Sequence, residues 1–104
     1  MLIQSEIVML TPEQKKQLKA LIVSDKTKYQ IGKSEITNAL LTMLDKALEA
    51  RELIRVEVLK NASTPIMELT LDLSSKLHAD VVSVVGRVIV LFRRNKENPK
   101  IKLK

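Results

Sequence analysis

The hydrophobic period of the chain changes within residues 36–59, and this change constrains the fold more than any other feature. From residue 36 to residue 51, apolar side chains recur every three or four positions, as on one face of a helix. Residues 53–59 then alternate between apolar and polar, which is typical of a strand. A short apolar run at residues 29–31 precedes them and ends at Gly32. We therefore predict a strand, a glycine turn, a long helix and a second strand.

The flanking segments add a helix before this unit and a hairpin after it. Thr11 can cap a helix, Pro12 fits its first position, and Gln14 completes a capping box, so we predict a helix over residues 12–24. Residues 81–85 and 88–92 are β-branched runs on either side of a Gly-Arg pair, which predicts a hairpin with a tight turn.

Residues 65–77 fit two structures. Apolar and polar side chains alternate over residues 67–73, which favours a strand. A helical period also fits the same residues, with Ser63 or Thr64 as its cap and Pro65 at its first position. We take the helix, because a crossover between parallel strands needs one.

Together these elements predict a single α/β (α+β) domain with the order α-β-α-β-α-β-β. Right-handed crossovers would assemble the strands into a mixed four-stranded sheet with helices packed against it. We assign residues 9–94 to this domain, residues 1–8 to an N-terminal extension and residues 95–104 to a basic C-terminal tail.

The composition argues against several classes of function. The chain has no cysteine, and its single histidine, His78, has no metal-ligating neighbour, so we read it as a turn residue and expect no metal or other cofactor. Motifs of nucleophilic or phosphoryl-transfer enzymes are absent, and we expect a protein that is not an enzyme. No apolar run approaches the ~18 residues of a membrane span. We expect a cytoplasmic monomer that does not bind membranes.

Positive charge is concentrated toward the two ends of the chain. Residues 13–33 carry six bases and two acids, and residues 81–104 carry seven bases and one acid. Residues 34–80 carry five bases and eight acids. If the fold brings the ends together, it makes a basic face opposite an acidic one, which suits a phosphate backbone or anionic lipid.

The turn at Gly32, Lys33 and Ser34 is the best candidate for a phosphate contact. A helix that begins after a glycine turn presents unpaired N–H groups and a positive dipole end beside the lysine. We expect the lysines of the first helix to lie near this loop. Tyr29 could stack on a base, but a lone aromatic in a short strand is more often part of the core. The residues predicted to contact a phosphate backbone are Lys15, Lys16, Lys19, Lys28, Gly32, Lys33, Ser34, Arg87, Arg93 and Arg94.

Several stretches, in the right order, resemble the CRM domain, an RNA-binding module of chloroplast splicing and ribosome maturation factors. The resemblance is to its stand-alone bacterial YhbY-like form and covers about residues 10–94. The resembling residues are Leu10-Thr11 with Gln14 and Leu18, Ile31-Gly32-Lys33, Ile36-Thr37, residues 47–56, Val84-Val85-Gly86-Arg87, and Val90-Leu91-Phe92-Arg93.

The resemblance implies a fold akin to the C-terminal domain of translation initiation factor three. It also implies binding to ribosomal RNA and a role in assembly of the large ribosomal subunit. Members of the family carry a GxxG loop, which corresponds to residues 32–35 here, with Glu35 in place of the second glycine. We expect Glu35 to stabilise the start of the second helix and to oppose phosphate, so that Glu35→Gly would tighten RNA binding. The alternative function is a protein-interaction module whose basic face docks an acidic protein.

Overall fold

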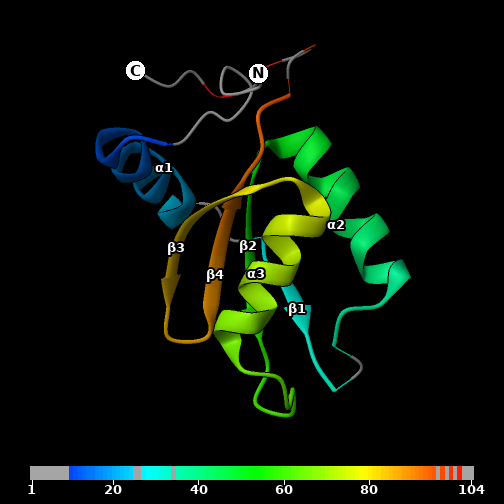
Figure 1. Ribbon diagram of the computed structural model, residues 1–104. Helices are drawn as coiled ribbons and strands as arrows, with labels where there is room; N and C mark the ends of the chain where they lie inside the picture. The colour runs from blue at the N-terminus through cyan, green and yellow to red at the C-terminus, as the bar shows by residue number, and fades with distance from the viewer. Residues whose placement is uncertain are drawn as a thin grey trace, which may run out of the picture.

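The computed structural model describes residues 10–24, 27–33, 35–95, 97, 99 and 101 (Figure 1). The predicted extension at residues 1–8 and the predicted site residue Ser34 lie outside them. The elements follow in the predicted order: α1 (Pro12–Ser24), β1 (Tyr29–Ile31), α2 (Asn38–Arg51), β2 (Leu53–Val58), α3 (Ile66–Leu77), β3 (Asp80–Val85) and β4 (Val88–Phe92).

The strands form the predicted mixed four-stranded sheet, and their order in it is β1-β2-β4-β3. β1 is parallel to β2, with Ile31 opposite Val58. β4 is antiparallel to both of its neighbours, with Phe92 opposite Leu53 on β2. This register brings the end of β1, the end of β2 and the β3–β4 hairpin to one end of the sheet. The start of β2 and the end of β4 lie at the other.

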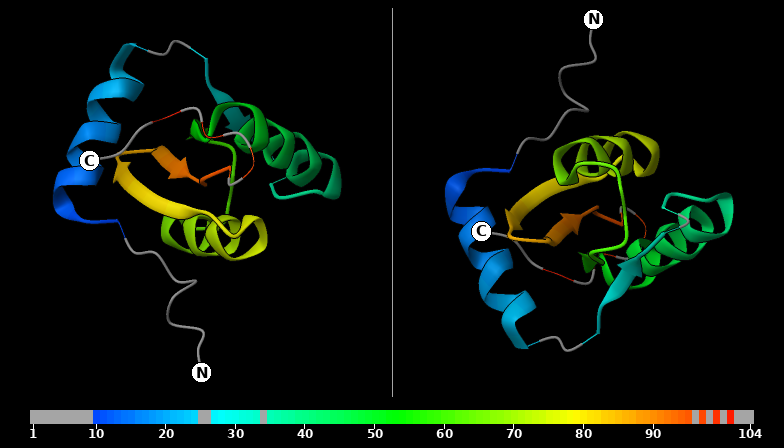
Figure 2. Two further views of the ribbon diagram at one scale, coloured as in Figure 1. Left: turned by 90° about the horizontal axis from the view of Figure 1, so that it is seen from above. Right: turned by 90° about the horizontal axis from the view of Figure 1, so that it is seen from below.

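The helices cover opposite faces of the sheet, α2 and α3 on one and α1 on the other (Figure 2). Alternation along the central strands explains how both faces are buried. Ile54, Val56 and Val58 of β2 pack with α2 and α3 in the larger core. Leu53 turns the other way and joins a smaller core under α1. Leu10 and Ile101 both pack against this smaller core, so the two ends of the domain lie close together.

The ends of the helices agree with some predictions and correct others. The capping box at α1 is confirmed, because the Thr11 N–H donates to Gln14 Oε1 at 3.0 Å and the Gln14 N–H donates to Thr11 Oγ1 at 3.1 Å. The predicted start of the second helix at residue 36 is wrong, since Thr37 is the N-cap and accepts from the Leu40 N–H at 3.1 Å.

Residues 65–77 contain the predicted helix, although its cap differs from the prediction. Pro65 is the N-cap residue, and no side chain caps this end of α3. At the other end, His78 is the C-cap in the left-handed conformation, with φ at 53°, as expected of a turn residue. Among the described residues, no helix combines the length and the apolar character that crossing a bilayer requires.

Candidate nucleic-acid interface

Two loops at one end of the sheet are joined through the carboxylate of Glu35. This carboxylate accepts four hydrogen bonds from the loop between β2 and α3: Ser63 N–H at 2.8 Å, Ser63 hydroxyl at 2.9 Å, Thr64 N–H at 2.8 Å and Thr64 hydroxyl at 2.5 Å. The bonds from Thr64, and then those from Ser63, lower the pKa of Glu35 to about 2. The expected role of Glu35 at the start of the second helix is therefore wrong, because its side chain fixes the loop before α3 instead.

The backbone at Glu35 explains why a glycine suits this position in the family pattern. Its φ is 54°, in the left-handed region that glycine enters readily and most other residues avoid. Glu35 adopts this conformation while its carboxylate holds Ser63 and Thr64. The loop between β1 and α2 thus keeps the backbone shape that a glycine would allow and gains a link to the neighbouring loop.

Gly32 lies against that same neighbouring loop. A Cβ atom at Gly32 would lie 3.4 Å from Asn61 Oδ1 and 3.6 Å from Leu59 Cδ1, in van der Waals contact with both side chains. The Leu59 N–H donates to the Ile31 carbonyl at 2.8 Å and aligns the two loops. Lys33 and Lys60 are exposed, one on each loop. Sequence reasoning did not select Lys60, because the register that brings its loop beside Gly32 appears only in the folded chain.

Arg87 closes a third loop at the same end of the sheet. Its Nε donates to the Val58 carbonyl at 2.8 Å and its Nη2 donates to the Leu59 carbonyl at 2.9 Å, and the residue is half-buried. The Arg87 carbonyl in turn accepts from the Val58 N–H at 2.7 Å. The guanidinium therefore holds the hairpin against the end of β2, and its charge adds to that of Lys33 and Lys60.

The lysines of α1 lie toward the other end of the sheet. α1 packs on Leu53 and Phe92, where β2 starts and β4 ends. A strand rises about 3.3 Å per residue, so β2 separates this end from the Gly32 loop by about 16 Å. The expected proximity of the α1 lysines and the loop is therefore not found. Lys16 and Lys19 are exposed, and Lys15 is half-buried.

Lys15 faces Asp80 at the start of β3. Burial raises the pKa of the Asp80 carboxyl, and the charge of Lys15 opposes this rise. The charge of Lys15 is thus partly used within the fold, whereas Lys16 and Lys19 present theirs to solvent.

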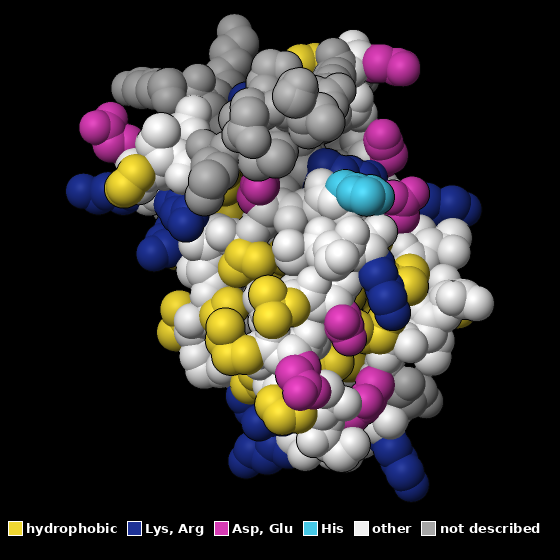
Figure 3. Space-filling model, in the orientation of Figure 1, with side chains coloured by type: hydrophobic (Ala, Val, Ile, Leu, Met, Phe, Trp, Pro, Cys, Tyr) yellow, Lys and Arg dark blue, Asp and Glu magenta, His cyan; other side chains and the backbone are white. Residues whose placement is uncertain are grey.

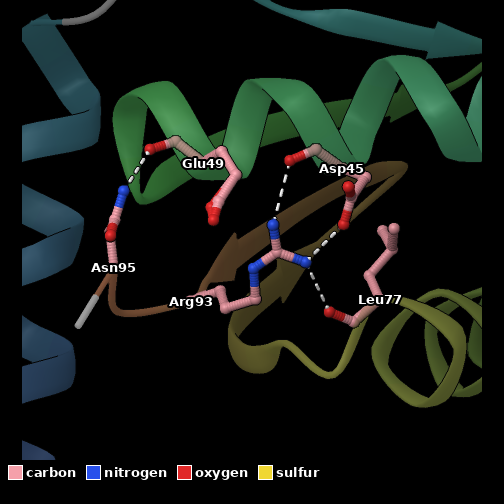
Figure 4. A network of polar contacts seen from close by, with 5 residues as sticks. All are labelled: Asp45, Glu49, Leu77, Arg93 and Asn95. Atoms are coloured by element: carbon pink, nitrogen blue, oxygen red, sulfur yellow. Dashed lines mark hydrogen bonds and ion pairs between the residues drawn. The ribbon is translucent and has the colours of Figure 1, made fainter. Parts of the chain in front are cut away.

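Arg93, directly after β4, links this strand to α2 and α3 (Figure 4). Its Nη1 lies 2.7 Å from Asp45 Oδ1 and also donates to the Leu77 carbonyl at 2.9 Å. Its Nη2 donates to the Asp45 carbonyl at 2.9 Å. Only 20 % of the Arg93 side chain is exposed. Arg94, the next residue, is exposed, and its guanidinium lies 6.0 Å from the centre of the Phe92 ring.

Glu52 is a buried carboxylate at the end of α2. The residue is fully buried and is the C-cap of α2, with a φ of 65° and its N–H donating to the Leu48 carbonyl at 2.8 Å. Its side chain accepts the Asn95 N–H and the Ile101 N–H, each at 2.7 Å. The Asn95 side chain also donates to the Glu49 carbonyl at 3.0 Å. Glu52 thus anchors two described residues of the predicted basic tail to the domain.

Two residues considered in the sequence analysis remain, Tyr29 and Lys28. Tyr29 packs against the larger core, which agrees with the structural interpretation of this aromatic. Lys28 Nζ lies 3.2 Å from Glu57 Oε1 on the side of the sheet that α1 covers in part. Among the described residues, no group of three or more His, Asp or Glu side chains is arranged to hold a metal ion.

Charge is divided between the faces of the molecule. The face of α2 and α3 exposes acidic side chains from Asp45, Glu49, Glu68 and Asp72, together with apolar Met67 and Leu71. Figure 3 shows this face, with acidic and hydrophobic side chains over its middle and most Lys and Arg side chains toward its periphery. Of the exposed cations described above, Lys33 and Lys60 lie at the loop end of the sheet, Lys16 and Lys19 lie on α1, and Arg94 follows β4.

Comparison with known proteins gives consistent matches over nearly the whole chain. The family model of the CRS1/YhbY (CRM) domain matches residues 10–93. The chain is 34 % identical over 95 residues to Probable RNA-binding protein YqeI of Bacillus subtilis, covering 91 % of this chain and 99 % of that protein. It is 29 % identical over 86 residues to Probable RNA-binding protein PA4753 of Pseudomonas aeruginosa, covering 83 % of each. The solution structure of the hypothetical protein SAV1595 from Staphylococcus aureus has a TM-score of 0.75 and 40 % identity, with 92 % of this chain and 100 % of that chain covered.

Proposed function

Since the chain belongs to the CRS1/YhbY (CRM) domain family, we propose that it binds ribosomal RNA in the cytoplasm and acts in assembly of the large ribosomal subunit. The observation that carries this proposal is the joined pair of loops at one end of the sheet. There Gly32 brings backbone close to the neighbouring loop, and Lys33 and Lys60 are exposed on either side. The relatives named as RNA-binding proteins support the class of ligand.

The mechanism is electrostatic docking of folded RNA on two groups of cations. The first group lies at the loop end of the sheet and comprises Lys33, Lys60 and the charge of Arg87. The second lies on α1 and beside it, and comprises Lys16, Lys19 and Arg94. Contacts to phosphate position an RNA without reading its bases. If the complex makes about five phosphate contacts, the logarithm of its binding constant falls against the logarithm of salt concentration with a slope of about −3.5 to −4.5.

Sedimentation of the tagged protein from a lysate through sucrose gradients, at low and at high salt, tests this proposal. We expect co-migration with precursors of the large subunit at low salt, and loss of that co-migration at high salt and in Lys33→Ala. Lys76→Ala is the matched control, because it removes one exposed lysine from α3 on the acidic face. Migration with free protein only, or with a protein partner that survives nuclease treatment, would overturn the proposal.

A further inference from the structure

An open hollow lies on the sheet face that α1 covers only in part. α1 lies against the upper part of the sheet in Figure 1, near the end where β2 starts. Beyond it, Lys28, Arg55, Glu57 and Val88 line a hollow of about 340 Å³. Sites for small molecules occupy about 300–1,000 Å³, so this hollow has room for one nucleotide base but not for a helix of RNA.

The strand register accounts for the chemistry of this hollow. Ile54, Val56 and Val58 face the larger core, so Arg55 and Glu57 emerge on the opposite face of β2. Glu57 is flanked in the sheet by Gln30 on β1 and by Val88 on β4. The hollow therefore has a carboxylate at its centre, cations beside it and one apolar wall.

Glu57 is held as a charged acceptor. Its Oε1 accepts from the Gln30 side chain at 3.1 Å and lies 3.2 Å from Lys28 Nζ. The bond from Gln30, followed by the bond and the charge of Lys28, lowers the pKa of Glu57. The Gln30 and Lys28 side chains thus both contact the Oε1 atom of the Glu57 carboxylate. The Lys28 side chain is 49 % exposed, so it can leave the carboxylate for another anion.

From this arrangement we infer that the hollow is a subsite for a single unstacked guanine of the bound RNA. This inference rests on the proposed function, because the guanine arrives as part of an RNA strand. A carboxylate only accepts hydrogen bonds, whereas the side chains of Lys28 and Arg55 only donate them. Guanine presents two adjacent donors, N1–H and N2–H, for Glu57, and an acceptor, O6, for Arg55. Its ring contacts Val88, and Lys28 moves to the phosphate.

The other bases match this set of groups less well. Along their Watson–Crick edges, adenine and cytosine each offer one amino donor next to a ring acceptor. Uracil offers one donor between two carbonyl acceptors. Each of these bases places an acceptor where Glu57 would repel it, so the carboxylate selects against them. The carboxylate also argues against a bare phosphate as the occupant, because its charge would repel that anion.

Binding of nine-nucleotide RNAs that differ only at the central base tests the inference. The probes are oligouridylates with G, A, C or U at the centre, labelled for fluorescence anisotropy and measured at one salt concentration. We expect the G probe to bind about tenfold more tightly than the others, as for one good bidentate contact to a base. Glu57→Gln should remove this preference and leave binding of the all-U probe within about twofold. Glu68→Gln, an exposed acid on the opposite face, should change neither quantity.

A second measurement locates the ligand on the protein. In amide NMR spectra, 5′-GMP should shift the signals of Gln30, Arg55, Glu57 and Val88, and 5′-AMP should shift them less. Equal binding of the four probes, a guanine preference that survives in folded Glu57→Gln, or GMP shifts confined to other residues would overturn the subsite and leave RNA binding intact. Failure of every probe and of ribosomal RNA itself to bind would overturn the proposed function and the subsite together.

Discussion

Arg93→Ala should destabilise the fold, because the guanidinium holds β4 to α2 and α3 through three hydrogen bonds. The pair with Asp45 is partly screened, since 56 % of the Asp45 side chain is exposed, and such a pair contributes about 0.5 kcal/mol. The bonds to the Asp45 and Leu77 carbonyls contribute about 1 kcal/mol each. The free energy of unfolding should therefore fall by about 2–3 kcal/mol in the variant, a large part of the 5–15 kcal/mol typical of a domain.

Arg94→Ala is the matched control for this prediction. Its guanidinium is exposed, and its contact with the Phe92 ring at 6.0 Å is worth about 0.5 kcal/mol or less. Urea unfolding followed by circular dichroism measures both variants. At a temperature where both are folded, Arg94→Ala should reduce the slope of RNA affinity against salt by about 0.7–0.9, as for one lost phosphate contact. Arg93→Ala should leave that slope near the wild-type value.

Two results would refute this reasoning. If Arg93→Ala unfolds at the same urea concentration as the wild type, the three bonds do not stabilise the domain. If the folded variant loses as much salt dependence as Arg94→Ala, the Arg93 guanidinium contacts RNA, as the sequence alone predicts.

Three further variants test the carboxylates. Glu52→Gln should lower the free energy of unfolding by about 2–3 kcal/mol, because the Asn95 and Ile101 N–H groups donate to different carboxylate oxygens and the NH2 group that replaces one of them cannot accept. Proteolysis of the C-terminal segment should accelerate. Glu35→Gln should lower the free energy of unfolding at pH 7. Because the pKa of Glu35 is lowered to about 2 in the folded protein, the difference in free energy of unfolding between variant and wild type should shrink as pH falls from about 4.5 to 2. Unfolding measured over this pH range tests this, and a constant difference would contradict the four hydrogen bonds. Asp80→Asn should raise the free energy of unfolding at pH 7. Burial raises the pKa of Asp80 above 3.8 in the folded protein, so the wild type loses stability as pH rises from 3.8 through this raised pKa. Thermal melts at pH 7 and pH 3 should show the gain only at the higher pH.

Local patterns in the sequence predicted most of the elements, whereas the choice of a helix at residues 65–77 also needed the requirement for a crossover between parallel strands. The capping box of α1 joins residues three positions apart, and the period of α2 and the alternation of β2 are likewise local, so each can be read without knowing the fold. The link from Glu35 to Ser63 spans 28 residues, and that from Arg93 to Asp45 spans 48. A charged residue in the sequence does not reveal which distant groups it will contact. This is why the role of Glu35 was predicted wrongly while the strands were not.

Contacts between residues far apart in the sequence also decide which charges are available to an RNA. Lys28 is paired with Glu57, Arg87 with the carbonyls at the end of β2, and Arg93 with Asp45 and Leu77. The exposed cations that we assign to RNA binding form two groups, one at the loop end of the sheet and one on α1 and beside it, separated by about the length of β2. A folded RNA can reach both groups at once through its shape, whereas base-specific reading of RNA targets unstacked nucleotides in loops and bulges. The hollow around Glu57 lies between the two groups, so a single unstacked base there would add sequence preference to contacts that otherwise only position the RNA.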